Sequence, residues 1–131
     1  MAKTGSLVMP ATILIAEDSA DTRAVLMRAL AFRGYHVVEA ADGREAVEVA
    51  ESECPDLVLM DLNMPVMDGL AATERIRELR DKCGNIPVVA ITAFDTYGMR
   101  EAAAEVGCNA YLLKPLDLDE LESVIAGLLL V

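Results

Sequence analysis

Short runs of apolar residues alternate with amphipathic stretches along the chain, and this alternation constrains the fold more than any other feature. Five runs are expected to be strands, at about residues 12–16, 36–40, 56–60, 86–91 and 110–113. After each run, apolar residues recur at intervals of three and four, which is typical of helices with one buried face. Because the runs are almost wholly apolar, both faces of each strand should be buried. The sequence therefore predicts an α/β protein with a doubly wound, five-stranded parallel sheet.

Glycines and acidic residues indicate where the expected helices begin and end. Gly34 ends the first helix, and a weaker, alanine-rich helix over 96–106 ends at Gly107. Capping boxes at 42–45 and 117–120 begin the second and last helices. Since crossovers between parallel strands are right-handed, few topologies remain, and the flavodoxin-like (βα)5 strand order 2-1-3-4-5 fits.

Length and composition limit the class of protein. The chain has 131 residues, of which 54% are hydrophobic, so we expect a tail at residues 1–10 and one domain over residues 11–131. A net charge of −11 argues against nucleic acid as a direct partner, because phosphate binding needs clusters of Lys and Arg. No apolar run approaches the roughly 18 residues of a membrane span, so membrane insertion is not expected.

The three cysteines are Cys54, Cys83 and Cys108, and their number is odd and their spacing wide. With a single histidine in the chain, a zinc site would lack ligands. We therefore expect reduced thiols in the cytosol that pack as small apolar side chains.

Polar residues stand where the expected strands end. Glu17 and Asp18 follow the first strand, Asp61 the third, Thr92 the fourth and Lys114 the fifth. The carboxyl ends of parallel strands form one edge of the sheet, where α/β proteins bind ligands. These five side chains should therefore converge on one site.

The chemistry of that set indicates phosphoryl transfer. Three neighbouring carboxylates repel one another unless a cation such as Mg²⁺ is bound, and Mg²⁺ prefers oxygen ligands. An ammonium and a hydroxyl can stabilise phosphoryl oxygens, and an aspartate can itself form an acyl phosphate. The chain has no Gly-rich phosphate-binding loop with Lys and Ser or Thr, so ATP is not expected as the directly bound donor.

Four motifs in order carry a resemblance to a known family: 13–18, 56–69, 87–93 and 111–115. Over roughly residues 11–130 the chain resembles the receiver domain of two-component response regulators, in the CheY-like superfamily. The resemblance implies that Asp61 is the phosphoacceptor. It also implies that Glu17, Asp18 and Asp61 bind Mg²⁺ together with the backbone carbonyl of Asn63.

Further roles follow from the same resemblance. Thr92 matches the switch hydroxyl that closes on the phosphoryl group, Lys114 its ion-pair partner, and Tyr111 the aromatic that changes rotamer with it. Ala93 matches a small residue that leaves access to the phosphoryl group. Phe94 flanks the path of the water that hydrolyses the acyl phosphate, and its bulk is expected to slow that step. The peptide bond after Lys114 is expected to be cis.

The resemblance implies a cytoplasmic signalling switch that is phosphorylated by a sensor histidine kinase or a histidine phosphotransfer protein. The switch would act on an unidentified downstream protein and catalyse only its own phosphorylation and autodephosphorylation. The sequence leaves open whether it is a stand-alone regulator or a receiver excised from a longer chain.

Other functions stay open at this point. A receiver-like module that binds partners without phosphorylation would keep the fold. A phosphatase of the haloacid dehalogenase kind also uses an aspartate nucleophile, but its Asp-x-Asp pair belongs on the first strand, whereas residues 61–63 follow the third. A flavodoxin-type electron carrier needs a phosphate loop and aromatic residues around the flavin, and the chain has no Trp, three Tyr and two Phe. Asp18 could alternatively cap the first helix.

Overall fold

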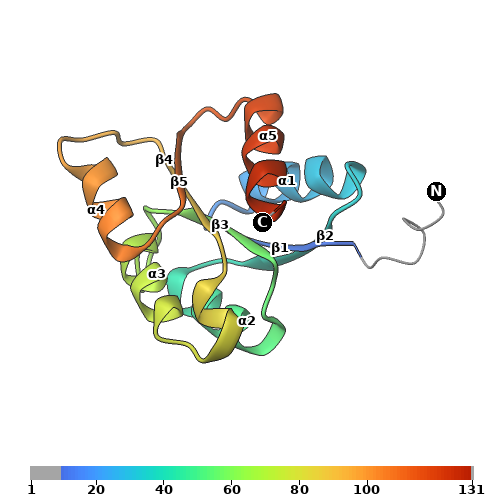
Figure 1. Ribbon diagram of the computed structural model, residues 1–131. Coiled ribbons are helices and arrows are strands. Elements are labelled where there is room, and N and C mark those ends of the chain that lie inside the picture. Colours follow the sequence, from blue (N-terminus) through green and yellow to red (C-terminus); the bar gives the residue numbers. More distant parts are fainter. Residues whose placement is uncertain (1–9, 131) are drawn as a thin grey trace.

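The computed structural model describes residues 10–130, and within that range the expected strands form one parallel sheet (Figure 1). The strands are β1 (Thr12–Ala16), β2 (His36–Ala40), β3 (Leu57–Asp61), β4 (Val88–Thr92) and β5 (Ala110–Leu113). Their order is β2-β1-β3-β4-β5, and all neighbouring pairs are parallel. The predicted doubly wound, flavodoxin-like architecture is confirmed.

Helices cover both faces of this sheet. They are α1 (Ala20–Phe32), α2 (Gly43–Glu53), α3 (Gly69–Arg77), α4 (Met99–Val106) and α5 (Leu118–Leu129). In Figure 1, α1 and α5 lie together on one side of the sheet, and α2 and α3 lie on the other. A short 3-10 helix, η2 (Asp81–Asn85), leads into β4 and was not predicted. Residues 1–9 of the expected tail lie outside the described residues.

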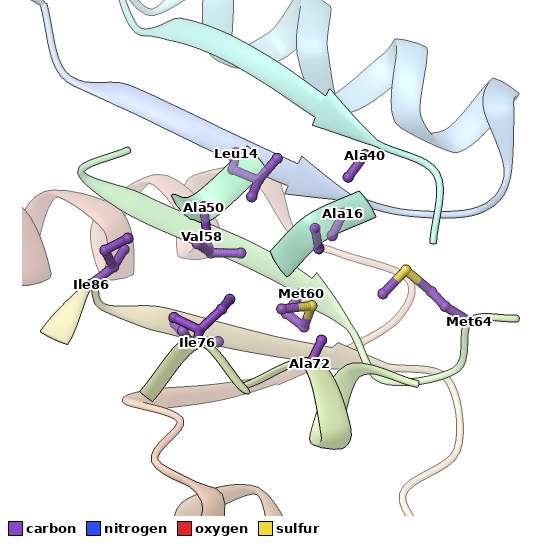
Figure 2. Close-up of a cluster of buried hydrophobic side chains, with 12 residues drawn as sticks. Leu14, Ala16, Ala40, Ala50, Val58, Met60, Met64, Ala72, Ile76 and Ile86 are labelled. Atoms are coloured by element: carbon purple, nitrogen blue, oxygen red, sulfur yellow. The ribbon is translucent and has the colours of Figure 1, made fainter. Parts of the chain in front are cut away.

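Alternate residues of the central strands face different helices. In β1, Ile13 and Ile15 belong to a cluster with Leu26 of α1 and Ile125 of α5. Leu14 and Ala16 belong to the opposite cluster, which packs against α2 and α3. Figure 2 shows this second cluster, in which the labelled side chains are Leu14, Ala16, Ala40, Ala50, Val58, Met60, Met64, Ala72, Ile76 and Ile86. β3 and β4 are buried along their whole length, which explains why they carry no polar residue before their last position. The expected burial of both faces does not hold for β2, which lies at the edge of the sheet and leaves His36 and Glu39 exposed.

Side-chain caps start most of the helices. Asp42 and Asp117 accept hydrogen bonds from backbone N–H groups of the first turn, as their capping boxes predict. Ser19, not Asp18, caps α1, so the capping role considered for Asp18 is excluded. The expected helix over 96–106 begins only at Met99, because Gly98 adopts a left-handed φ of 83° that stops the helix from extending toward residue 96.

The expectation for the cysteines is wrong for two of the three, which all lie within the described residues. Cys54 and Cys83 form a disulfide, with Cα atoms 5.3 Å apart, and Cys108 is a free, partly buried thiol. The bridge forms because α2 ends at Cys54 beside the η2 segment, at the amino edge of the sheet. A sequence separation of 29 residues gave no sign of this proximity.

Within residues 10–130, no helix is both long and apolar enough to cross a lipid bilayer.

Candidate functional site

Three carboxylates meet at the carboxyl edge of β1 and β3. One oxygen from each of Glu17, Asp18 and Asp61 lies within 4.8 Å of the others. Glu17 and Asp61 are only 3% and 4% exposed, whereas Asp18 faces solvent. The predicted acidic cluster therefore exists, with two members in the protein interior and one at the surface.

The Glu17 side chain is held by hydrogen bonds on both of its oxygens. Oε1 accepts a hydrogen bond from Lys114 Nζ at 3.0 Å, and Oε2 accepts one from the backbone N–H of Ser19 at 3.0 Å. The guanidinium of Arg23 donates to the Glu17 carbonyl oxygen at 2.7 Å and pairs with Glu39 on β2. Because Arg23 lies on α1 rather than at a strand end, the sequence pattern did not single it out.

Asp61 is also bonded through both oxygens. Oδ1 accepts from the backbone N–H of Asn63 at 2.9 Å, and Oδ2 accepts from Lys114 Nζ at 3.1 Å. Burial of Lys114 acts to lower the pKa of its ammonium, but the hydrogen bonds to Glu17 and Asp61 outweigh burial and raise this pKa. Lys114 is therefore a stable cation between two buried anions.

Thr92 ends β4 beside this cluster and is completely buried. Its hydroxyl donates to Asn63 Oδ1 at 2.9 Å and accepts from the backbone N–H of Phe94 at 3.0 Å. Its carbonyl oxygen accepts from the backbone N–H of Lys114, which joins the ends of β4 and β5. The Lys114–Pro115 peptide bond is cis, as the sequence resemblance implied.

Tyr111 lies on β5 and contacts a different set of residues. Its hydroxyl donates to Asp95 Oδ1 at 2.9 Å, and the guanidinium carbon of Arg100 lies 4.4 Å from its ring centroid. Burial and the hydrogen bond to Asp95 raise the pKa of the phenol. The sequence pattern did not single out Asp95 or Arg100, because Asp95 lies within the β4–α4 loop and Arg100 on α4, and neither directly follows a strand.

The two residues expected to flank the site follow β4. Ala93 and Phe94 are both exposed, and 59% of the Phe94 surface is accessible to solvent.

The donor chemistry of the cluster fits Mg²⁺. Its oxygens are hard ligands, and the exposed Asp18 leaves one side open for the water molecules that Mg²⁺ retains. Three carboxylates against the single Lys114 ammonium also leave an excess of negative charge. A divalent cation would neutralise this excess.

Comparison with known proteins decides the family. Residues 13–126 match the response regulator receiver domain family. The chain is a response regulator receiver domain. This receiver therefore belongs to two-component signal transduction, in which receiver domains accept phosphoryl groups.

Named relatives agree with this assignment. The response regulator MprA of Mycolicibacterium vanbaalenii is 40% identical to the receiver over 121 residues, covering 92% of this chain and 51% of that protein. The transcriptional regulatory protein PdtaR of Mycobacterium tuberculosis is 44% identical over 114 residues, covering 86% of this chain and 54% of that protein. The receiver thus spans about half the length of these regulators.

Solved structures share the fold closely. The receiver domain of the sensor histidine kinase PA1611 from Pseudomonas aeruginosa is 35% identical, with a TM-score of 0.86 and coverage of 93% of this chain and 99% of that one. That structure holds a magnesium ion in its active-site cleft. The chemotaxis protein CheY4 of Vibrio cholerae is 28% identical with a TM-score of 0.84, covering 91% of this chain and 98% of that one.

Proposed function

We propose that Asp61 is the phosphoacceptor of this receiver and that it takes its phosphoryl group from a phosphohistidine. The main support is the position of Asp61, a buried carboxylate at the end of β3 with Lys114 Nζ 3.1 Å away and Glu17 and Asp18 beside it. A nucleophilic carboxylate needs nearby positive charge to approach an anionic phosphoryl group, and the Lys114 ammonium supplies one such charge.

In the transfer step, an oxygen of Asp61 attacks phosphorus and a P–O bond forms. The P–N bond to the donor histidine breaks, and its electron pair stays on the imidazole nitrogen. The product is an acyl phosphate on Asp61. Lys114 and the Thr92 hydroxyl would then stabilise its oxygens, the first as an ion pair and the second as a hydrogen-bond donor.

Magnesium is the cofactor of this proposal. Glu17, Asp18, Asp61 and the backbone carbonyl of Asn63 would hold the ion, which supplies neutralising positive charge for the phosphoryl oxygens. The magnesium-containing receiver from P. aeruginosa, which is 35% identical, supports this ligand chemistry.

An apolar groove next to the site suits a protein donor. It has a volume of about 550 Å³ and lies between α1 and the segment that follows β5. Val25, Leu26, Pro115 and Leu116 line it, and Lys114 forms part of its wall. A helix of a sensor histidine kinase or histidine phosphotransfer protein could dock there and present its phosphohistidine to Asp61.

The output of this receiver would be a protein-interaction switch with Thr92 and Tyr111 as its moving residues. Phosphorylation shifts the population toward the conformation that contacts the phosphoryl group better, and a downstream effector protein would bind that conformation.

We propose that the receiver acts in the cytoplasm and catalyses only its own phosphorylation and autodephosphorylation. We place its domain boundary near residue 11, just before β1, with residues 1–10 as a tail.

Mass spectrometry of the intact chain tests the proposal. After incubation with Mg²⁺ and acetyl phosphate, we expect one phosphoryl adduct that disappears with EDTA and in Asp61→Ala. Labelling from a phosphohistidine protein would then identify the cognate donor. An adduct that persists in Asp61→Ala would contradict the assignment. No adduct from either donor would favour a module that binds partners without phosphorylation.

A further inference from the structure

The Asn63 side chain contacts the switch hydroxyl directly, and this contact has a consequence for switching. Thr92 Oγ1 lies 2.9 Å from Asn63 Oδ1, and the same Oγ1 accepts the Phe94 N–H at 3.0 Å. A hydroxyl carries a single hydrogen, so it makes one good donor bond at a time. The hydroxyl has two acceptors in reach, the Asn63 amide oxygen at 2.9 Å and the Phe94 carbonyl oxygen at 3.5 Å, and the shorter distance assigns the Thr92 hydrogen to Asn63.

Asn63 is also tied to the acceptor carboxylate. Its backbone N–H donates to Asp61 Oδ1 at 2.9 Å, which fixes residue 63 relative to the end of β3. Asn63 is exposed at the surface, so packing holds its side chain much less than the hydrogen bond to Thr92 does. One residue therefore links the carboxylate that would be phosphorylated to the hydroxyl that would respond.

We propose that the Asn63 side chain is a positioning residue that holds Thr92 in the resting conformation and competes with the phosphoryl group for its hydroxyl. This inference rests on the proposed function of Asp61 and Thr92. For Thr92 to donate to a phosphoryl oxygen, it must release Asn63 Oδ1. The resting hydrogen bond therefore opposes activation, and removing its acceptor shifts the equilibrium toward the active conformation.

The experiment uses beryllofluoride, a stable mimic of the aspartyl phosphate, so that hydrolysis does not enter the measurement. Its dissociation constant is measured by calorimetry on the full chain at saturating Mg²⁺. We expect Asn63→Ala to bind beryllofluoride about fivefold more tightly than the wild type, which corresponds to the loss of one ordinary hydrogen bond. The substitution keeps the backbone carbonyl proposed as a magnesium ligand, and Mg²⁺ affinity is measured separately for each variant so that every titration is made at saturation.

A double-mutant cycle separates this role from a merely structural one. In a Thr92→Val background, which has no hydroxyl to compete for, Asn63→Ala should leave the dissociation constant unchanged. In a Thr92→Ser background, which keeps the hydroxyl, the tightening should return. Equal effects in the Val and Ser backgrounds, or weaker binding in Asn63→Ala alone, would overturn the inference.

Failure of the proposed function gives a different result. If the wild type does not bind beryllofluoride, or binds it as well after Asp61→Ala, then Asp61 is not the phosphoacceptor and the inference about Asn63 falls with it. Normal binding to the wild type together with no effect of Asn63→Ala would overturn the inference about Asn63 alone.

Discussion

Lys114 balances two carboxylates that have almost no contact with water. Glu17 and Asp61 are 3% and 4% exposed, and both accept hydrogen bonds from the same ammonium. Removing one partner of a buried charge pair is costly, because it leaves the other partner desolvated and unpaired. Lys114 therefore contributes to stability as well as to the proposed chemistry.

We expect Lys114→Met to lower the free energy of unfolding by about 2 kcal/mol in EDTA, less than the roughly 3–5 kcal/mol of a fully buried pair, because the ammonium is partly exposed. Urea denaturation followed by circular dichroism measures this. Mg²⁺ should restore part of the loss, since a bound cation neutralises the same carboxylates. Lys82→Met, at an exposed lysine of η2, is the control and should change stability by less than about 0.5 kcal/mol. Equal losses in the two variants would refute this role for Lys114.

The difference in unfolding free energy between the wild type and Lys114→Met should depend on pH, because the pKa of Lys114 is raised in the folded protein. A basic group with a raised pKa in the folded state stabilises the fold fully below its unfolded pKa, which is about 10.4 for lysine. This contribution is lost as the pH rises through the folded pKa. The stability gap between wild type and Lys114→Met should thus stay constant from neutral pH to about pH 10 and narrow above it. Urea titrations at a series of pH values test this, and a gap that narrows below pH 9 would contradict it.

Phe94 is the residue whose bulk is expected to control the lifetime of the acyl phosphate. Replacing it with glutamate should shorten the half-life several-fold, because a carboxylate beside the site can hold and orient a water molecule that the ring would exclude. Loss of the phosphoryl adduct over time, measured by mass spectrometry, tests this. Phe94→Leu keeps an apolar side chain and should retain a long half-life; identical half-lives in Phe94→Glu and wild type would rule out the shielding role.

At the scale of elements, the apolar periodicity and the caps predicted most boundaries. The five strands and the starts of α2 and α5 lie within two residues of where the sequence placed them, and the largest difference is at β4, which starts at Val88 rather than at residue 86. Two elements differ from the prediction, the start of α4 and the short helix η2. Gly98 is left-handed and delays α4 to Met99, and η2 forms where no periodic pattern predicts a helix.

The start of α3 lies directly against the backbone of the proposed phosphoacceptor. A Cβ atom on Gly69 would lie 2.4 Å from the carbonyl oxygen of Asp61 and 2.8 Å from Leu62 Cα. Gly69→Ala must therefore displace either α3 or the end of β3. We expect it to lower the free energy of unfolding by about 1–3 kcal/mol and to slow phosphorylation of Asp61 by acetyl phosphate.

Gly127 provides a matched control, because it lies within α5 and an added Cβ meets nothing within 4 Å. Gly127→Ala should be neutral or stabilise the protein by up to about 1 kcal/mol, with an unchanged rate of phosphorylation. Thermal unfolding and adduct formation are measured for both variants. A Gly69→Ala variant that behaves like Gly127→Ala would contradict the proposed steric contact.

At the scale of the whole molecule, the Cys54–Cys83 disulfide closes a loop that contains β3, Asp61 and α3. Constraining a loop with a separation of 29 residues stabilises a fold by about 3–4 kcal/mol, mainly by restricting the unfolded chain. We expect dithiothreitol to lower the wild-type unfolding free energy by that amount and to leave the unfolding free energy of the Cys54→Ser/Cys83→Ser double variant unchanged.

Alkylation of the folded, oxidised protein gives a second test of the bridge. Burial raises the pKa of the Cys108 thiol, so its alkylation at pH 8 should be slow. Rapid alkylation at Cys54 or Cys83 before reduction would argue against the bridge.

The sequence by itself determined the fold class, the strand order and the residues at the carboxyl edge of the sheet. It could do so because burial on both faces makes the central parallel strands apolar, and because Glu17, Asp61, Thr92 and Lys114 each end a strand or directly follow one. Only the tertiary structure decided which side chains contact one another. The bond of Thr92 to Asn63, that of Tyr111 to Asp95 and the Cys54–Cys83 bridge join segments that are distant in sequence. A local pattern of apolar residues cannot predict such contacts, because they depend on how loops and helix ends pack around the sheet.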